Sequence, residues 1–245
     1  MSPRVTLAVA ARVLTQLRRD HRTLALMLLV PCLLLTLLWW MFDGDDTVFN
    51  RFGPPMLALF PFTVMFLVTS VTTLRERTTG TLERLLAMPT GKGDLLVGYM
   101  VAFGLVALLQ AALAVGVTVG LLGLAVDGPV GVLVVVAVLD AALGTALGLF
   151  VSAFAATEFQ AVQFMPALVV PQILLCGLFV PRPALPPVLE AVSGVLPLSY
   201  AVEAMQEVQS RAGVTLDLGL DLLVVMAFAA SSLALGAATL RRRTA

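Results

Sequence analysis

The polar segment 75–94 interrupts a chain that is otherwise strongly apolar. Three leucines within it are spaced at i, i+3 and i+4, so they share one face of a short helix. They are Leu82, Leu85 and Leu86. Gly80 and Thr81 come just before as a turn and a cap, and Pro89 and Gly91 come after as a stop. This pattern favours a short amphipathic helix to which a partner could bind. The alternative is a solvated loop with incidental charge.

Three polar residues lie inside apolar stretches and are candidates for a substrate path. Asp140 falls near the middle of one stretch, where an ionisable group costs at least about 2.5 kcal/mol. It predicts a contact for a cationic or polar substrate or a proton site, or alternatively a hydrogen bond within the bundle. Gln110 and Gln172 favour hydrogen bonds between helices. No Cys or His residues have metal-ligand spacing, and we expect no metal site.

The composition predicts an all-α polytopic membrane protein. Of the 245 residues, 60% are hydrophobic and 12% are charged, which excludes an ordinary water-soluble domain. Six apolar stretches are long enough to cross a bilayer. They are residues 24–42, 54–74, 95–124, 129–153, 162–181 and 218–240. We expect one transmembrane domain over 1–245. Small-residue pairs at Gly116/Gly120 and Gly144/Gly148 allow close helix packing, within the chain in preference to a dimer seam.

Basic residues predict the orientation of these spans. If the N-terminus is cytoplasmic, all but three of the 15 Lys and Arg residues fall on the cytoplasmic side. The exceptions are Arg51, Arg182 and Arg211. The positive-inside rule then predicts cytoplasmic N- and C-termini in a cell (inner or plasma) membrane.

The segment 1–23 before the first span predicts an interfacial amphipathic helix. Val5, Val9, Val13 and Leu17 form an apolar ridge at a spacing of four residues. The arginines fall on one neighbouring arc, facing lipid phosphates or a partner. They are Arg4, Arg12, Arg18, Arg19 and Arg22. The alternative is a plain positively charged anchor.

The run Arg75-Glu76-Arg77-x-x-Gly80-Thr81-Leu82-Glu83-Arg84 resembles the signature loop of type-2 ABC exporter permeases, the membrane subunits of drug and antibiotic exporters. Arg75 stands where the family pattern has Glu, and one extra residue precedes Gly80. A second similarity is the proline-rich region 182–217. Its prolines exclude one continuous helix, and the family has short re-entrant outer helices here. The matching residues include Pro197, Tyr200 and Glu203.

The resemblance implies a separate ATPase subunit that binds ATP and Mg, since this sequence contains no phosphate-binding loop motif. Two ATPase copies would pair with two permease copies, a homodimer, in the membrane lipid. We expect no nucleic acid partner. The resemblance assigns ATPase coupling to a cytoplasmic helix between spans two and three. Its residues are Glu76, Gly80, Thr81, Leu82, Glu83 and Arg84.

The function expected on these grounds is export of a hydrophobic compound such as a drug, antibiotic or lipid-like molecule. One alternative is an ion- or proton-coupled secondary carrier that uses Asp140. Another is a non-transporting membrane scaffold that recruits a soluble partner through segment 75–94. A membrane-embedded enzyme is poorly supported, because His21 is the only histidine and lies outside the spans.

Overall fold

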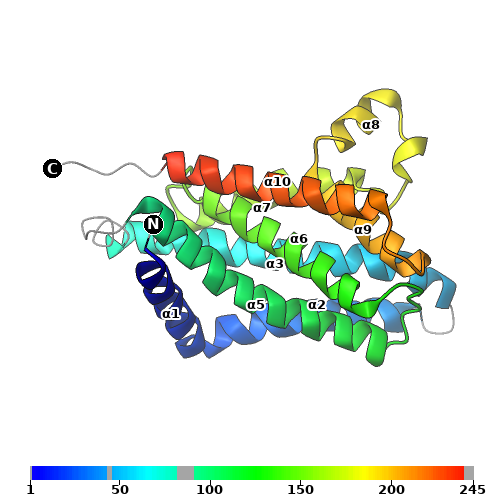
Figure 1. Ribbon diagram of the computed structural model, residues 1–245, viewed down its shortest axis with the longest axis horizontal. Coiled ribbons are helices and arrows are strands. Elements are labelled where there is room, and N and C mark those ends of the chain that lie inside the picture. The colour runs from blue at the N-terminus through cyan, green and yellow to red at the C-terminus, as the bar shows by residue number, and fades with distance from the viewer. Residues whose placement is uncertain (1, 43–45, 82–90, 240–245) are drawn as a thin grey trace.

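The computed structural model describes residues 2–42, 46–81 and 91–239, and the regular structure in these ranges is helical (Figure 1). The long helices are α1 (Pro3–Arg19), α2 (His21–Met41), α3 (Asp46–Thr78), α5 (Lys92–Gly120), α6 (Val130–Val151), α7 (Glu158–Leu175) and α10 (Leu216–Thr239). Three shorter ones are η1 (Arg182–Ala184), α8 (Pro187–Ser193) and α9 (Pro197–Ser210). Within the described residues, six helices are long and apolar enough to span a membrane, which confirms the predicted number.

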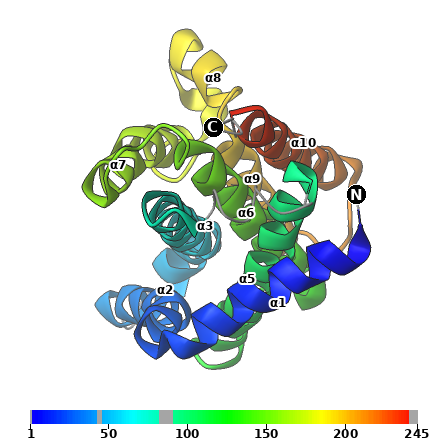
Figure 2. The same cartoon turned by 90° about the vertical axis from the view of Figure 1, so that its left-hand side faces the viewer.

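The long helices run along the axis of a bundle, and α1 lies across one end of it (Figures 1 and 2). The ends of α3 and α10 and the start of α5 lie at this same end. We call it the motif end, because the motif that begins at Arg75 starts there. Helix α8 lies at the opposite end, called here the α8 end. The chain therefore returns to the motif end after its sixth long apolar helix.

Helix α3 is the centre of the bundle and packs against α2, α5, α6, α7 and α9. Its 33 residues make it about 50 Å long, more than the roughly 30 Å of a bilayer core. The expected span 54–74 lies inside it. The helix continues through Thr78, so the first residues of the predicted 75–94 loop are its last turn. This corrects the expected boundary, because the charged side chains there find partners on other helices.

Two glycines bring α3 and α6 together. A Cβ at Gly144 would meet the Phe62 carbonyl oxygen, and one at Gly148 would meet that of Phe66. This confirms the close packing predicted for this pair. For Gly116 and Gly120 the predicted packing within the chain is not found, because both are exposed and have no described neighbouring atom within 4 Å of an added Cβ.

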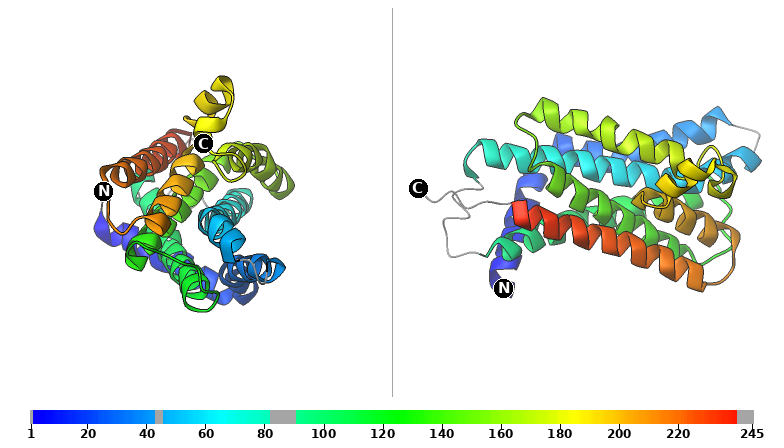
Figure 3. Two further views of the ribbon diagram at one scale, coloured as in Figure 1. Left: turned by 90° about the vertical axis from the view of Figure 1, so that its right-hand side faces the viewer. Right: turned by 90° about the horizontal axis from the view of Figure 1, so that it is seen from above.

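The prolines between residues 181 and 197 break the chain as predicted. Helices α8 and α9 meet at 86°. Helix α9 packs against α3, α6 and α10, while η1 and α8 extend away from the bundle (Figure 3). If this bent pair is counted as one crossing, the described residues contain up to seven candidate spans.

Candidate functional site

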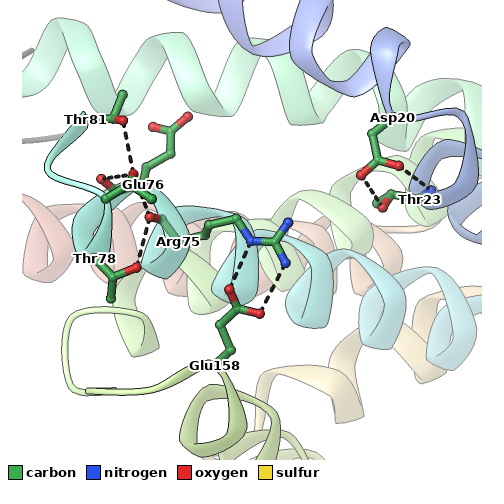
Figure 4. A network of polar contacts seen from close by, with 8 residues as sticks. Asp20, Thr23, Arg75, Glu76, Thr78, Thr81 and Glu158 are labelled. Atoms are coloured by element: carbon green, nitrogen blue, oxygen red, sulfur yellow. Dashed lines mark hydrogen bonds and ion pairs between the residues drawn. The ribbon is translucent and has the colours of Figure 1, made fainter.

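Three consecutive side chains at the end of α3 reach three different helices. Arg75, Glu76 and Arg77 are about 100° apart around the helix axis, so they point in separate directions. Arg75 binds α7, Glu76 binds α1, and Arg77 binds the end of α6 (Figure 4 shows the first of these contacts). We call these three residues and their partners the α3 hub.

The contact of Glu76 with Arg12 is the most buried ion pair of the hub. The Arg12 guanidinium donates to Oε1 of Glu76, whose side chain is only 8% exposed. A hydrogen bond between charged groups is worth about 1.5–3 kcal/mol when water is largely excluded. The pair joins residues 64 positions apart in the sequence and ties α1 to α3.

The other two hub contacts lie nearer the surface. Arg75 binds the Glu158 carboxylate through two hydrogen bonds of 3.0 and 3.1 Å, and both side chains are about half exposed. Such a pair contributes about 0–1 kcal/mol. Arg77 donates to the carbonyl oxygen of Ser152, the C-cap of α6. A cation there also complements the negative end of the helix dipole.

Gly80 ends the hub with a change of chain direction. Its φ is +71°, a left-handed conformation in which side chains are strained. The Gly80 amide donates to the Arg77 carbonyl at 3.2 Å, and the Thr79 hydroxyl contacts that of Thr81 at 3.1 Å. The predicted turn at Gly80 is therefore confirmed. Leu82, Glu83 and Arg84, also expected to couple to an ATPase, lie outside the described residues, as does most of the predicted helix.

Helix α1 is held in place by groups on α5 whose role in this contact was not predicted from the sequence. The Asp94 carboxylate, in the first turn of α5, accepts from the Ser2 amide at 2.8 Å and the Thr6 hydroxyl at 3.3 Å. Gly98 lets α1 cross α5 closely, because an added Cβ would stand 2.7 Å from Cβ of Val9. In the sequence, the acidic Asp94 in the first turn of α5 and the small Gly98 were the only signals of this contact with α1.

The amphipathic pattern of α1 is confirmed in its apolar ridge, with Val9, Val13 and Leu17 buried. Four of the five predicted arginines are exposed: Arg4, Arg18, Arg19 and Arg22. Arg12 instead faces the protein. The assignment of Arg22 to this helix is wrong, because Asp20 breaks it. The Asp20 carboxylate caps α2 through the Thr23 amide, so Arg22 lies in the first turn of α2.

The three substrate-path candidates lie on three different helices, and two of them form hydrogen bonds between helices. Gln110 on α5 donates to the Met27 carbonyl of α2 at 2.7 Å. Gln172 on α7 accepts from the Leu198 amide of α9 at 3.3 Å. Both predicted helix-to-helix hydrogen bonds are thus confirmed. Asp140 is fully buried, and neither of its oxygens has a hydrogen-bond partner in the described part of the chain.

The predicted residues of the proline-rich region surround an arginine that was not predicted. Arg182 forms an ion pair with Glu203, and its guanidinium carbon stands 4.9 Å from the centre of the Tyr200 ring. The Tyr200 hydroxyl donates to the Gly194 carbonyl at 2.7 Å. Pro197 occupies the first turn of α9, where its missing amide proton costs nothing. These contacts fix the bend between α8 and α9.

The sequence is similar to known transporter subunits. The ABC-2 type transporter family model matches residues 4–210. The chain is 26% identical to the inner membrane transport permease YhhJ of Escherichia coli over 65% of its own length and 43% of that protein's. It is 26% identical to the probable multidrug ABC transporter permease YbhS of the same species, over 66% and 44%.

A eukaryotic relative, the ABC transporter G family member 20 of Dictyostelium discoideum, is 24% identical over 65% of this chain and 22% of its own length. In each of these alignments the chain spans less than half the length of the relative. The family model nevertheless covers the hub, five of the six long apolar helices and the bent pair. This chain therefore belongs to the ABC-2 type transporter family and is a membrane permease subunit of an ABC transporter.

Proposed function

We propose that this chain is the membrane half of an exporter for a hydrophobic compound, powered by a separate ATPase subunit that docks on segment 75–94. The α3 hub is the observation that carries this proposal. It connects the start of that segment to α1, α6 and α7. The name of the related YbhS, a probable multidrug permease, supports a hydrophobic cargo.

The hub suggests how force from the ATPase enters the bundle. A push on the chain after Gly80 acts on the last turn of α3, whose side chains hold three other helices. Because α3 also packs against five helices, its displacement moves much of the bundle. Glu76 is buried against Arg12, so we assign it to holding α1 and leave contact with the ATPase to the residues from Gly80 onward. The switch would be a rigid movement of packed helices.

The distribution of arginines supports a cytoplasmic motif end in an inner or plasma membrane. Among the described residues, this end holds Arg4, Arg12, Arg18, Arg19, Arg22, Arg75 and Arg77, and the opposite end holds Arg51, Arg182 and Arg211. The α8–α9 pair then becomes a re-entrant outer element. Two permease copies and two ATPase subunits, with ATP and Mg bound by the latter, complete the proposed assembly.

Membership of the ABC-2 type family favours this proposal over a secondary carrier or a scaffold. The carrier depends on Asp140, which is buried but lies away from the α3 hub in the sequence and contacts none of its residues through a described hydrogen bond. A scaffold would bind an ATPase without moving cargo. ATP-driven transport by the complete complex would distinguish the exporter from the scaffold, which moves no cargo, and from the carrier, which is driven by an ion or proton gradient.

The test is the substrate-stimulated ATPase activity of the purified complex in lipid, with a charge swap across the buried ion pair. Arg12→Glu and Glu76→Arg each place like charges together and should reduce stimulation about tenfold, the equivalent of about 1.4 kcal/mol. The double swap should recover most of it. The ATPase should co-purify in every case, because docking residues are untouched.

Arg211→Glu is the matched control, since Arg211, the residue directly after α9, pairs with Glu207 of α9 at the other end. It should leave stimulation unchanged. The proposal fails if no ATPase co-purifies with the wild-type chain, or if the single swaps behave as wild type. Elution as a single peak in size-exclusion chromatography checks that each variant is folded.

A further inference from the structure

Helix α1 contacts both ends of segment 75–94, on which we propose that the ATPase docks. At the start of the segment, Arg12 binds Glu76 in the last turn of α3. At its end, Asp94 in the first turn of α5 binds the beginning of α1. We call these the start contact and the end contact. Helix α1 therefore connects the two helices between which the segment lies in the sequence.

The Asp94 carboxylate uses both of its oxygens in the end contact. Oδ1 accepts from the Ser2 amide at 2.8 Å and from the Thr6 hydroxyl at 3.3 Å. Oδ2 accepts from the amide of Gly91, the N-cap of α5, at 3.3 Å. An added Cβ at Gly91 would stand 2.8 Å from Oδ2, so the glycine gives the carboxylate room to lie there. One side chain thus joins the last residues of the segment to the first residues of α1.

Burial and charge both favour a carboxylate at this position. Asp94 is only 5% exposed. Its charge lies in the first turn of α5 and beside the N-cap of α1, so it faces the positive ends of two helix dipoles. Hydrogen bonds to an ionised acceptor are also stronger than those between neutral groups. A neutral side chain in place of Asp94 would therefore weaken the end contact.

Close packing continues the end contact one turn further along α5. Asp94 and Gly98 are four residues apart, so they share one face of α5. An added Cβ at Gly98 would stand 2.7 Å from Cβ of Val9 on α1. Arg12, which makes the start contact, lies six residues beyond Thr6, or about 9 Å along the helix. Because α1 is one continuous helix, it sets the spacing between the two contacts.

We propose that Asp94 is a positioning residue for docking of the ATPase, because it fixes the end of segment 75–94 on α1 before the ATPase binds. A segment whose end is already in place loses less conformational freedom on binding, which raises affinity. The start contact lies before the docking residues and transmits their movement to α1. Loss of the two contacts should therefore have separable effects. This role rests on the proposed function, because it takes segment 75–94 as the docking site.

The test measures the Kd of the ATPase for the permease in lipid nanodiscs and, separately, the maximal substrate-stimulated activity at saturating ATPase. Asp94→Ala removes the hydrogen bonds to Ser2, Thr6 and Gly91 and should raise the Kd about tenfold. Asp94→Asn keeps one acceptor oxygen, which can serve α1 or Gly91 but not both, and should raise it about threefold. Maximal stimulation should stay within about twofold of wild type in both variants.

The start contact gives the opposite pattern in the same assay. Arg12→Glu should lower maximal stimulation and leave the Kd unchanged. Asp217→Ala is the matched control for Asp94→Ala, because it removes an exposed carboxylate from the first turn of α10. It should change neither quantity. Thr6→Val removes one donor of the end contact at constant shape and carries the test if Asp94→Ala does not fold.

A spectroscopic measurement checks the end contact without the ATPase. Leu7→Cys on α1 and Leu109→Cys on α5 place spin labels at positions that are 62% and 55% exposed. The native cysteines, Cys32 and Cys176, are both buried. The distance distribution from double electron–electron resonance should broaden in Asp94→Ala and stay narrow in Asp217→Ala. A narrow distribution in Asp94→Ala would overturn the proposal.

The results also separate this proposal from the proposed function. If the wild-type chain binds no ATPase, both fail. If the ATPase binds wild type and Asp94→Ala with the same Kd, the exporter stands and the positioning role of Asp94 is overturned. A lower maximal stimulation at unchanged Kd would also overturn it, because Asp94 would then act in transmission like the start contact.

Discussion

Both ends of the bundle contain arginine ion pairs, but those at the motif end join separate helices, whereas the one at the α8 end joins residues of one short segment. At the motif end, Arg75, Glu76 and Arg77 bind residues 64 to 83 positions away in the sequence. At the α8 end, Arg182 binds Glu203, only 21 positions away. The first set connects separate helices and can transmit movement. The second holds the shape of one short segment.

Of the predicted changes, replacing Gly98 should have the largest effect, because it disturbs the docking of α1 at the motif end. Gly98→Leu places a side chain where Val9 now lies and should displace α1 from α5. Overpacking of this kind costs about 1–3 kcal/mol, and substrate-stimulated ATPase activity should fall about tenfold or more. Gly116→Leu on the same helix faces open space and is the control. Equal loss in both variants would contradict a specific role for the docking of α1.

Replacing Arg182 should have a large effect that stays local. Arg182→Met removes the ion pair with Glu203 and the contact with the Tyr200 ring. Hydrogen exchange of the amides in 182–196 should become about tenfold faster, as expected for a loss of about 1.4 kcal/mol. Exchange in α1 should not change. Faster exchange in α1 as well would show that the two ends are coupled.

Two double-mutant cycles compare pairs within the hub. The Arg75–Glu158 pair is half exposed and should give a coupling energy below about 1 kcal/mol that disappears in 1 M salt. The more buried Arg12–Glu76 pair should give about 1.5–3 kcal/mol and resist salt. Urea or thermal denaturation of the neutral Gln variants in detergent measures both. Equal coupling energies for the two pairs would mean that burial does not determine how strongly each ion pair stabilises the protein.

The smallest effect concerns Asp20 and pH. Its hydrogen bonds with Thr23 lower its pKa below the ordinary value of 3.8. The carboxylate therefore stabilises the start of α2 above pH 3.8, and this contribution is lost as pH falls through the lowered pKa. Exchange of the Thr23 amide should be slower at pH 6 than at pH 3 after correction for intrinsic rates. In Asp20→Asn this pH dependence should vanish.

The spans and the ridge of α1 could be predicted because each depends on a local pattern. Apolar length identifies a helix that can cross a membrane, and a spacing of four residues identifies a buried ridge. The turn at Gly80 was predictable for the same reason, since glycine tolerates positive φ. The direction of Arg12 was not. Its angular position beside the other arginines suggested lipid phosphates or a partner molecule, whereas it binds Glu76 of the same chain.

The sequence by itself determined the helical class, the number of long apolar helices and the resemblance to ABC exporter permeases, because hydropathy and motif spacing are properties of neighbouring residues. Only the tertiary structure decided that Arg75, Glu76 and Arg77 hold three separate helices and that the first turn of α5 binds the beginning of α1. Those contacts depend on how α1 crosses α5 at Gly98, and on where α6 and α7 end and begin. Such long-range geometry leaves no periodic trace in the chain.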